Sequence, residues 1–389
     1  MDKDSLSVID ADSHVFEPAI IWEKYLDPAY RVAARSAFYY HEDEFAAGVT
    51  LNGRQAPLLH TGRLNRSAIW RPGMTPEEIG SLDPSRPYPI NPGANSAAAR
   101  LADMDKIGVD KAVIFPTLFS EYYPAVENPD LALALARAYN DWICDFCKDA
   151  PQRLFGAAVL PLQDVGFAIE ELHRVAGLGF KAVSIRPVFF EKRFINHPYY
   201  DVLWRQIEES GLTAAIHASP GVANSEWTST GSYVERVAAN LRIGHHVAES
   251  ISYTMDNAIA GTTFTYGGHP ERFPKLKLAY THGGIGWVSL MLEKTSNWAI
   301  FYMYNDINLD TERVFYERPY LVTLNPWESA ALHAYEVYKA IGAWGSRYPH
   351  HDASSATAAI ERFEKAGLPG DVIANYMGGN AARVYGIDQ

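Results

Sequence analysis

The residues best suited to chemistry are an aspartate and a histidine, Asp12 and His14, which stand two positions apart where an apolar segment, residues 8–11, ends. In a β-strand, residues i and i+2 point to the same side of the sheet, so we expect the two side chains to project together. A carboxylate oxygen and an imidazole nitrogen at a strand end supply half of a metal site. Taken alone, the pair also fits a capping aspartate beside a locally hydrogen-bonded histidine.

Two further histidines stand where predicted strands end. His217 follows the apolar run 213–216, and His282 follows the run 276–280. In a parallel barrel, the C-terminal ends of all strands meet at one face, where active sites lie. A single histidine of this kind is more often structural than a ligand. If the barrel closes, however, the strand ends predict one metal centre with the ligands Asp12, His14, His217 and His282.

A predicted helix over residues 234–261 offers two more ligands, His246 and Glu249. Positions i and i+3 of a helix share a face, and His/Glu pairs at this spacing approach dinuclear carboxylate sites. From the spacing alone, a solvent-exposed pair without a metal is the better interpretation. We nevertheless predict that both residues are ligands, because the segment leads onto the same rim of the barrel.

Apolar, β-rich runs alternate with helical stretches along the whole chain. The predicted strands are residues 8–11, 112–115, 155–160, 182–185, 213–216, 276–280, 320–324 and 340–344. This alternation predicts an α/β protein, a distorted (β/α)8 TIM barrel that forms a single domain over residues 1–389. An open doubly wound sheet is the alternative, but no glycine-rich dinucleotide turn follows the first strand.

Residues 31–95 do not fit the repeat and are rich in Pro, Gly, Arg and Tyr. We predict a long insertion after the first strand that acts as a lid or pocket wall, because long loops in compact domains are usually functional or disordered. An arm that contacts another subunit is the alternative.

Composition excludes several classes of protein. The 389 residues include 34 basic and 46 acidic side chains, a net charge of −12, with no basic run that would bind nucleic acid. No apolar run approaches the ~20 residues of a membrane span, and no signal-peptide apolar region opens the chain. We expect a cytoplasmic protein.

Cys144 and Cys147 form a C-x-x-C motif, which we interpret as core packing on a helix rather than a redox pair or half a zinc site.

Several motifs together resemble the amidohydrolase-related (amidohydrolase 2) family over residues 8–386. They are Asp12-x-His14-x-x-Glu17-Pro18, the fifth-strand His217, the segment 271–277, His282-Gly283-Gly284, Ser346-x-Tyr348-Pro349-His350 and the closing segment 380–386. The resemblance implies a metal-dependent decarboxylase or hydrolase on a distorted TIM barrel.

One position departs from the family pattern. Where the family usually has an aspartate that binds the metal and orients or deprotonates the attacking water, this chain has Arg347. A guanidinium is always protonated and has no lone pair for a cation. The chain is therefore inactive, replaces the aspartate, or uses its metal differently. Asp352 is a candidate replacement, as are His350 and His351, and we assign catalytic roles to His282, Arg347 and Asp352.

One branch of this group resembles the TIM-barrel nonheme diiron monooxygenase of platensimycin and platencin diterpenoid biosynthesis. This resemblance implies two iron ions per chain, O2 as co-substrate, a bulky apolar and CoA-linked substrate, and a homodimer. The predicted ligands offer imidazole nitrogen and carboxylate oxygen atoms, which suit iron. They are Asp12, His14, His217, His246, Glu249 and His282. Arg347 would then act as an anion clamp or a structural partner.

Two other functions stay open at this point. One is a mononuclear Zn or Mn hydrolase or decarboxylase in which His282 acts as the base for a metal-bound water. The other is a metal-free barrel used for binding or as a scaffold. Metal content separates the three functions.

Overall fold

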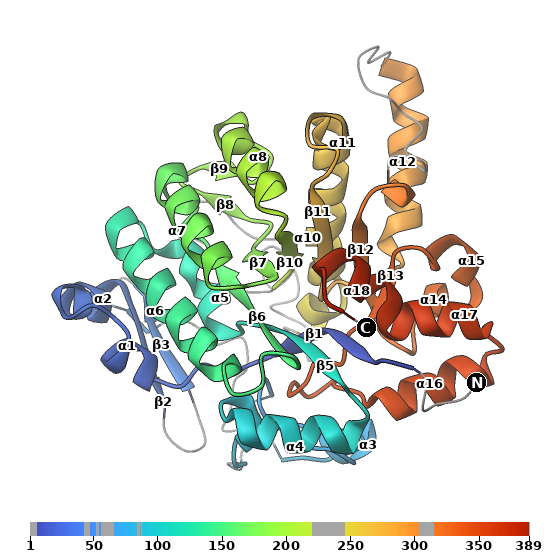
Figure 1. The fold of residues 1–389 in the computed structure, drawn as a ribbon, viewed down its shortest axis with the longest axis horizontal. Helices are drawn as coiled ribbons and strands as arrows, with labels where there is room; N and C mark the ends of the chain where they lie inside the picture. Colours follow the sequence, from blue (N-terminus) through green and yellow to red (C-terminus); the bar gives the residue numbers. More distant parts are fainter. Residues whose placement is uncertain are drawn as a thin grey trace.

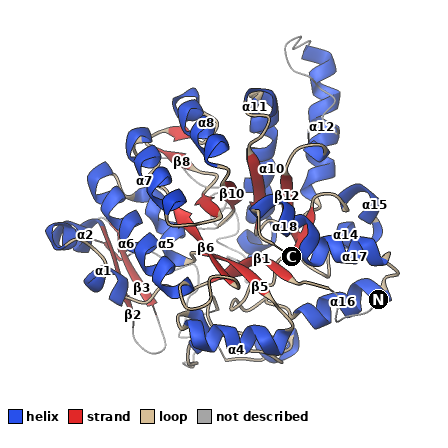
Figure 2. Cartoon of the chain, in the orientation of Figure 1, coloured by secondary structure: helices blue, strands red, loops and turns tan. Residues whose placement is uncertain are grey.

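A parallel sheet of eight strands forms the centre of the molecule and is surrounded by helices (Figures 1 and 2). The structure, a computed structural model, describes residues 6–42, 47–51, 54–55, 66–83, 86, 88–219, 246–302 and 315–388. The strands follow one another in chain order around the sheet. They are β1 (Ile9–His14), β5 (Lys111–Phe115), β6 (Leu154–Val159), β7 (Ala182–Ile185), β10 (Thr213–His217), β11 (Lys277–Thr281), β12 (Tyr320–Leu324) and β13 (Gly342–Trp344).

The helices that cover the sheet lie between these strands. The longer ones are α4 (Ala97–Ile107), α6 (Pro129–Cys147), α7 (Val165–Gly177), α8 (Asp201–Ser210), α10 (His246–Tyr266), α12 (Trp287–Tyr302) and α16 (Ala356–Lys365). Shorter ones are α1 (Ile20–Lys24), α2 (Arg31–Ala37), α3 (Pro76–Gly80), α5 (Leu118–Tyr122), α11 (His269–Arg272), α14 (Ser329–His333), α15 (Tyr335–Tyr338), α17 (Gly370–Ala374) and α18 (Asn380–Tyr385). The predicted (β/α)8 architecture is confirmed.

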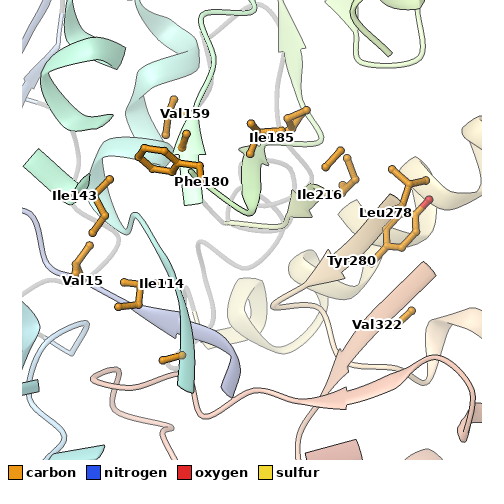
Figure 3. Close-up of a cluster of buried hydrophobic side chains, with 14 of the residues drawn as sticks. Val15, Ile114, Ile143, Val159, Phe180, Ile185, Ile216, Leu278, Tyr280 and Val322 are labelled. Atoms are coloured by element: carbon orange, nitrogen blue, oxygen red, sulfur yellow. The ribbon is translucent and has the colours of Figure 1, made fainter. Parts of the chain in front are cut away.

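Alternate residues of each strand face opposite sides of the sheet, and both sides are apolar. Ile114, Ile216 and Val322 belong to the outer core between sheet and helices, which Figure 3 shows in part. Val113, Ala215 and other inward residues form a separate core inside the barrel. Each fully buried Ile or Val contributes about 1.5–3 kcal/mol, so these two layers fix the strand register.

Helix α18 fills the N-terminal end of the barrel. Its side chains belong to the interior core, the Tyr385 hydroxyl donates to the Ala11 carbonyl at 3.2 Å, and the Thr213 hydroxyl donates to the Val384 carbonyl at 2.8 Å.

The predicted core role of the C-x-x-C motif is also confirmed. Cys144 and Cys147 are free thiols on α6 that pack against the outer core.

The barrel closes where the segment after β13 meets β1. The Arg347 amide donates to the Asp12 carbonyl at 2.9 Å, and the His14 amide donates to the Tyr348 carbonyl at 2.6 Å. A Cβ on Gly345 would lie 2.5 Å from the Asp12 Cβ, so this approach requires glycine. Barrel closure thereby places Asp12 at its C-terminal mouth.

The chain between β1 and β5 is long and only partly described. It contains a small antiparallel sheet, β2 (Phe38–Glu42), β3 (Ala47–Leu51) and β4 (Arg54–Gln55), while residues 43–46, 52–53, 56–65, 84–85 and 87 lie outside the described residues. The insertion over residues 31–95 and its lid role stay predictions. The predicted helix over residues 234–261 corresponds in part to α10, while residues 220–245 lie outside the described part, so its predicted start is not tested.

Within the described ranges, the chain has no helix that combines the length and apolar character needed to cross a membrane.

We predict that Gly345→Ala lowers the free energy of unfolding by about 1–3 kcal/mol, because the new methyl group overpacks the contact with Asp12. Urea denaturation measures the loss. Gly177→Ala is the matched control, since a Cβ on Gly177 meets nothing within 4 Å. Equal stability of the two variants would contradict the proposed closure.

Candidate metal centre

Four buried side-chain atoms without hydrogen-bond partners converge at the C-terminal mouth of the barrel. They are Asp12 Oδ1, His14 Nε2, His217 Nε2 and His282 Nδ1. Asp12 Oδ1 lies 3.3 Å from His14 Nε2 and 3.4 Å from His217 Nε2, and Asp12 Oδ2 lies 3.7 Å from His282 Nδ1. The four residues offer ligand atoms within 4.8 Å of one another and form a four-residue metal site. The structure thus brings together the four predicted strand-end residues.

Each of the four residues lies in the last part of its strand or directly after it. Asp12 and His14 lie within β1, whose register with β5 is irregular between Asp10 and Ser13. His217 is the last residue of β10. His282 follows β11, and its amide donates to Asp12 Oδ2 at 2.9 Å and to the Thr323 hydroxyl at 3.0 Å.

Two of the imidazoles are oriented as metal ligands. His14 Nδ1 lies 3.3 Å from the Pro116 carbonyl, and His217 Nδ1 lies 2.9 Å from the Ala218 carbonyl. A carbonyl only accepts, so each Nδ1 carries the ring proton and each Nε2 lone pair faces the cluster. This arrangement fits a divalent cation, which would satisfy the unpartnered atoms of Asp12, His14 and His217.

The protonation states of these side chains also favour binding of a divalent cation. Burial alone would raise the pKa of Asp12, but its contacts with His14 and His217 outweigh burial and hold the pKa well below the usual value. Burial lowers the pKa of His14, and burial together with Arg347 holds that of His282 well below 6.5. The site therefore offers an anionic oxygen and neutral nitrogens, the donors that Zn, Mn and Fe accept.

Arg347 lies against His282 rather than in the cation position. Its Nη2 is 2.8 Å from His282 Nε2, and its Nε is 2.9 Å from Asp352 Oδ2. Burial would raise the pKa of Asp352, but the Arg347 guanidinium and His351 outweigh burial and keep it low. Asp352, the predicted replacement for the missing aspartate, is thus an ionised partner of Arg347 and does not belong to the four-residue cluster.

The other predicted residues have mixed outcomes. His350 stacks on His14 with the ring centroids 4.2 Å apart, and its Nε2 lies 3.2 Å from the Thr117 hydroxyl. His351 lines the cavity. The side chains of His246 and Glu249 lie outside the described residues, so the structure does not test them as ligands.

Three carboxylates support the site in roles that the sequence analysis did not predict, although Glu17 belongs to the motif that begins at Asp12. Asp10 accepts from the Ser346 amide at 2.8 Å and from its hydroxyl, and burial raises the pKa of Asp10 to about 6. Glu17 accepts the Thr117 amide at 2.7 Å. Glu328 accepts the Ile285 amide at 2.8 Å and the Asn325 amide at 2.6 Å, which joins the loops after β11 and β12.

The metal site opens into a cavity of about 340 Å³. Its polar lining includes Ser120, Glu121, Ser219, Tyr253 and Asn325, with Trp327 as an aromatic wall. A cavity of this size and polarity suits a small polar ligand.

We predict that His217→Ala weakens Mn²⁺ binding by at least about 100-fold, because it removes a ligand atom of the cluster. Isothermal titration of the metal-free protein measures the affinity. His173→Ala, which changes an exposed histidine of α7, should leave the affinity unchanged. Unaltered binding by His217→Ala would contradict the site.

We predict that His350→Gln reduces the pH dependence of stability. Burial and the neighbouring His14 and His282 hold the pKa of His350 well below 6.5, whereas the unfolded chain takes up this proton near pH 6.5. Stability contributed by the neutral ring is therefore lost as pH falls below about 6.5. Between pH 7 and 5, the native metal-free protein should therefore lose more stability than the variant. Urea titrations at both pH values check this, and parallel losses would contradict it.

Solved structures share this fold across nearly the whole chain. An amidohydrolase from Mycobacterium avium subsp. paratuberculosis matches with a TM-score of 0.77 at 18% identity and covers 98% of this chain and 99% of its own. A variant of 5-carboxyvanillate decarboxylase from Novosphingobium aromaticivorans, solved with manganese and 3-methoxy-4-hydroxy-5-nitrobenzoic acid, matches with a TM-score of 0.64 at 17% identity, covering 99% and 98%.

Curated relatives match over shorter stretches. The 2-amino-3-carboxymuconate-6-semialdehyde decarboxylase of Dictyostelium discoideum is 24% identical over 188 residues, 48% of this chain and 47% of the relative. The gamma-resorcylate decarboxylase of Rhizobium sp. is 30% identical over 124 residues, 30% of this chain and 37% of the relative. The chain thus spans less than half the length of each of these two relatives.

These relatives overturn the predicted reaction. They are decarboxylases rather than oxidoreductases, so the prediction of a nonheme diiron monooxygenase is wrong. The predicted O2 and CoA-linked diterpenoid substrate depended on that reaction and are withdrawn with it. The physical reason is that a surplus of possible ligands in the sequence does not determine how many cations are bound or which reaction follows. The homodimer stays a prediction.

The family itself is shown by a match over almost the full length. The sequence model described as amidohydrolase covers residues 9–387, from the first residue of β1 to just beyond α18. The match includes the four converging donors and the strands that carry them. The chain therefore belongs to the amidohydrolase family.

Proposed function

We propose that this protein is a metal-dependent decarboxylase that releases CO2 from a small carboxylic acid without an oxidant. The observation that carries the proposal is the cluster of four buried donors, Asp12, His14, His217 and His282, which opens into the polar cavity. The decarboxylase relatives support the reaction class.

The cation that we propose is a single Mn²⁺ or Zn²⁺. The donor set of one carboxylate oxygen and imidazole nitrogens suits either ion, and manganese is bound in the decarboxylase structure from N. aromaticivorans. When bound, the cation would supply positive charge that holds and polarises a substrate carboxylate.

The side chains around the site would perform the remaining steps. Decarboxylation breaks a carbon–carbon bond and leaves an electron pair on carbon, which must then gain a proton. Arg347 cannot deliver it, because a guanidinium stays protonated, and Asp352 is ionised. We propose that this proton comes from solvent in the cavity and that His282, whose neutral ring borders both the cluster and the cavity, relays it by gaining one proton and passing one on to the carbon.

The size of the cavity supports a small substrate. About 340 Å³ suits a one-ring or similarly small unsaturated acid. Hydrolysis is the less favoured function, since Arg347 occupies the position from which the family's aspartate acts on water, and Asp352 is committed to its ion pair with Arg347.

The test is CO2 release by the Mn²⁺-loaded and Zn²⁺-loaded protein from a panel that includes 2,6-dihydroxybenzoate and 5-carboxyvanillate, with the corresponding methyl esters as hydrolase substrates. We expect CO2 from at least one acid and a rate at least about 100-fold lower for His217→Ala. Ester cleavage without CO2 release would replace decarboxylation with hydrolysis as the function.

A further inference from the structure

The contact between Arg347 and His282 determines which ring nitrogen of His282 carries the proton. Arg347 Nη2 lies 2.8 Å from His282 Nε2. A guanidinium has only N–H donors, so Nε2 must accept and must lack a hydrogen. A neutral imidazole then carries its hydrogen on Nδ1, the nitrogen that faces Asp12 Oδ2 at 3.7 Å.

This tautomer is the opposite of what metal ligation requires. A cation at the centre of the cluster would need the lone pair of His282 Nδ1, which would move the hydrogen to Nε2 and set it against the Arg347 N–H. Both contacts could coexist only if the ring lost its remaining proton as well, which a neutral imidazole does not do in water near pH 7. His14 and His217 have no such conflict, since carbonyl groups accept from their Nδ1 atoms.

The backbone around the contact holds both partners in place. His282 has a φ of 68° and Arg347 has a φ of 59°, so two non-glycine residues in the left-handed region face each other. The His282 amide is bonded to the Asp12 carboxylate, and the Arg347 amide is bonded to the Asp12 carbonyl. Asp352, at 2.9 Å from Arg347 Nε, fixes the guanidinium from its other side. The contact is thus built into the fold rather than made by a free surface side chain.

We propose that Arg347 withholds His282 from the metal. Asp12, His14 and His217 would hold the cation, while His282 turns an N–H rather than a lone pair toward the cluster and so leaves room for an oxygen ligand. Catalytic cation sites usually keep three protein ligands and one open position. The inference deepens the proposed function, since an open position is what a decarboxylase would need, but it concerns metal binding and is tested without substrate.

The test is a double-mutant cycle on Mn²⁺ affinity with Arg347→Met and His282→Ala. In the native background, we expect His282→Ala to change the dissociation constant by less than about threefold, whereas Arg347→Met should tighten binding at least about tenfold. With Arg347→Met present, His282 becomes a ligand, and adding His282→Ala should then weaken binding at least about tenfold. Loss of the positive charge of Arg347 could by itself tighten Mn²⁺ binding. In that case, Arg347→Met would tighten binding equally in the His282→Ala background.

Two outcomes would overturn the inference. One is that His282→Ala in the native background weakens Mn²⁺ binding as much as His217→Ala does. The other is that the gain from Arg347→Met survives in the His282→Ala background. The cycle is repeated with Asp352→Asn, because freeing Asp352 from Arg347 could create a new carboxylate ligand.

A second measurement does not depend on the folding of any Arg347 variant. In the native metal-free protein labelled with ¹⁵N-histidine, the His282 signals are assigned by their loss in His282→Ala. We expect a protonated Nδ1 and an unprotonated Nε2. The reverse pattern would overturn the inference, and a failure to find decarboxylation would not affect either measurement.

Discussion

Asp12 joins barrel closure to the metal centre. Its carbonyl accepts the Arg347 amide from the segment after β13, one carboxylate oxygen accepts the His282 amide after β11, and the other faces His14 and His217 without a hydrogen-bond partner. The last strand reaches Asp12 only because Gly345 lacks a side chain. The same aspartate thus closes the barrel and orients the donor cluster.

A bound cation would stabilise this arrangement. A buried polar atom without a partner costs roughly 1–3 kcal/mol, a cost that ligation of these donors would remove, and the left-handed conformations of His282 and Arg347 add strain. The surrounding hydrogen bonds of Asp10, Glu17 and Glu328 hold the loops in this state. Such preorganisation is typical of sites in which binding energy from a ligand completes the structure.

The sequence predicted the fold well because the strand signals are local. The strands Ala182–Ile185 and Tyr320–Leu324 have the predicted bounds, and the four donors stand at the expected strand ends. The Asp10–Ser346 contact could not be predicted, since it joins residues 336 positions apart. The tautomers could not be predicted either, because they depend on atomic geometry at the closed barrel. The sequence showed that Arg347 departs from the family pattern, but only the structure shows that it bonds to His282.

The reaction was the weakest sequence prediction, because ligand-type residues are compatible with several chemistries. Adding His246 and Glu249 to the four strand-end donors suggested two irons, yet the described part of the structure assembles only one compact set of donors. Arg347 then changes what that set can do, since it substitutes a fixed positive charge and hydrogen-bond donors for a carboxylate.

The most direct measurement of the central claim is anomalous X-ray diffraction from crystals of the Mn²⁺-loaded protein. A single anomalous peak at bonding distance from Asp12 Oδ1, His14 Nε2 and His217 Nε2 is the predicted result. Full occupancy of Mn²⁺ elsewhere, with no peak between these three atoms, would contradict the metal centre on which the proposed function depends.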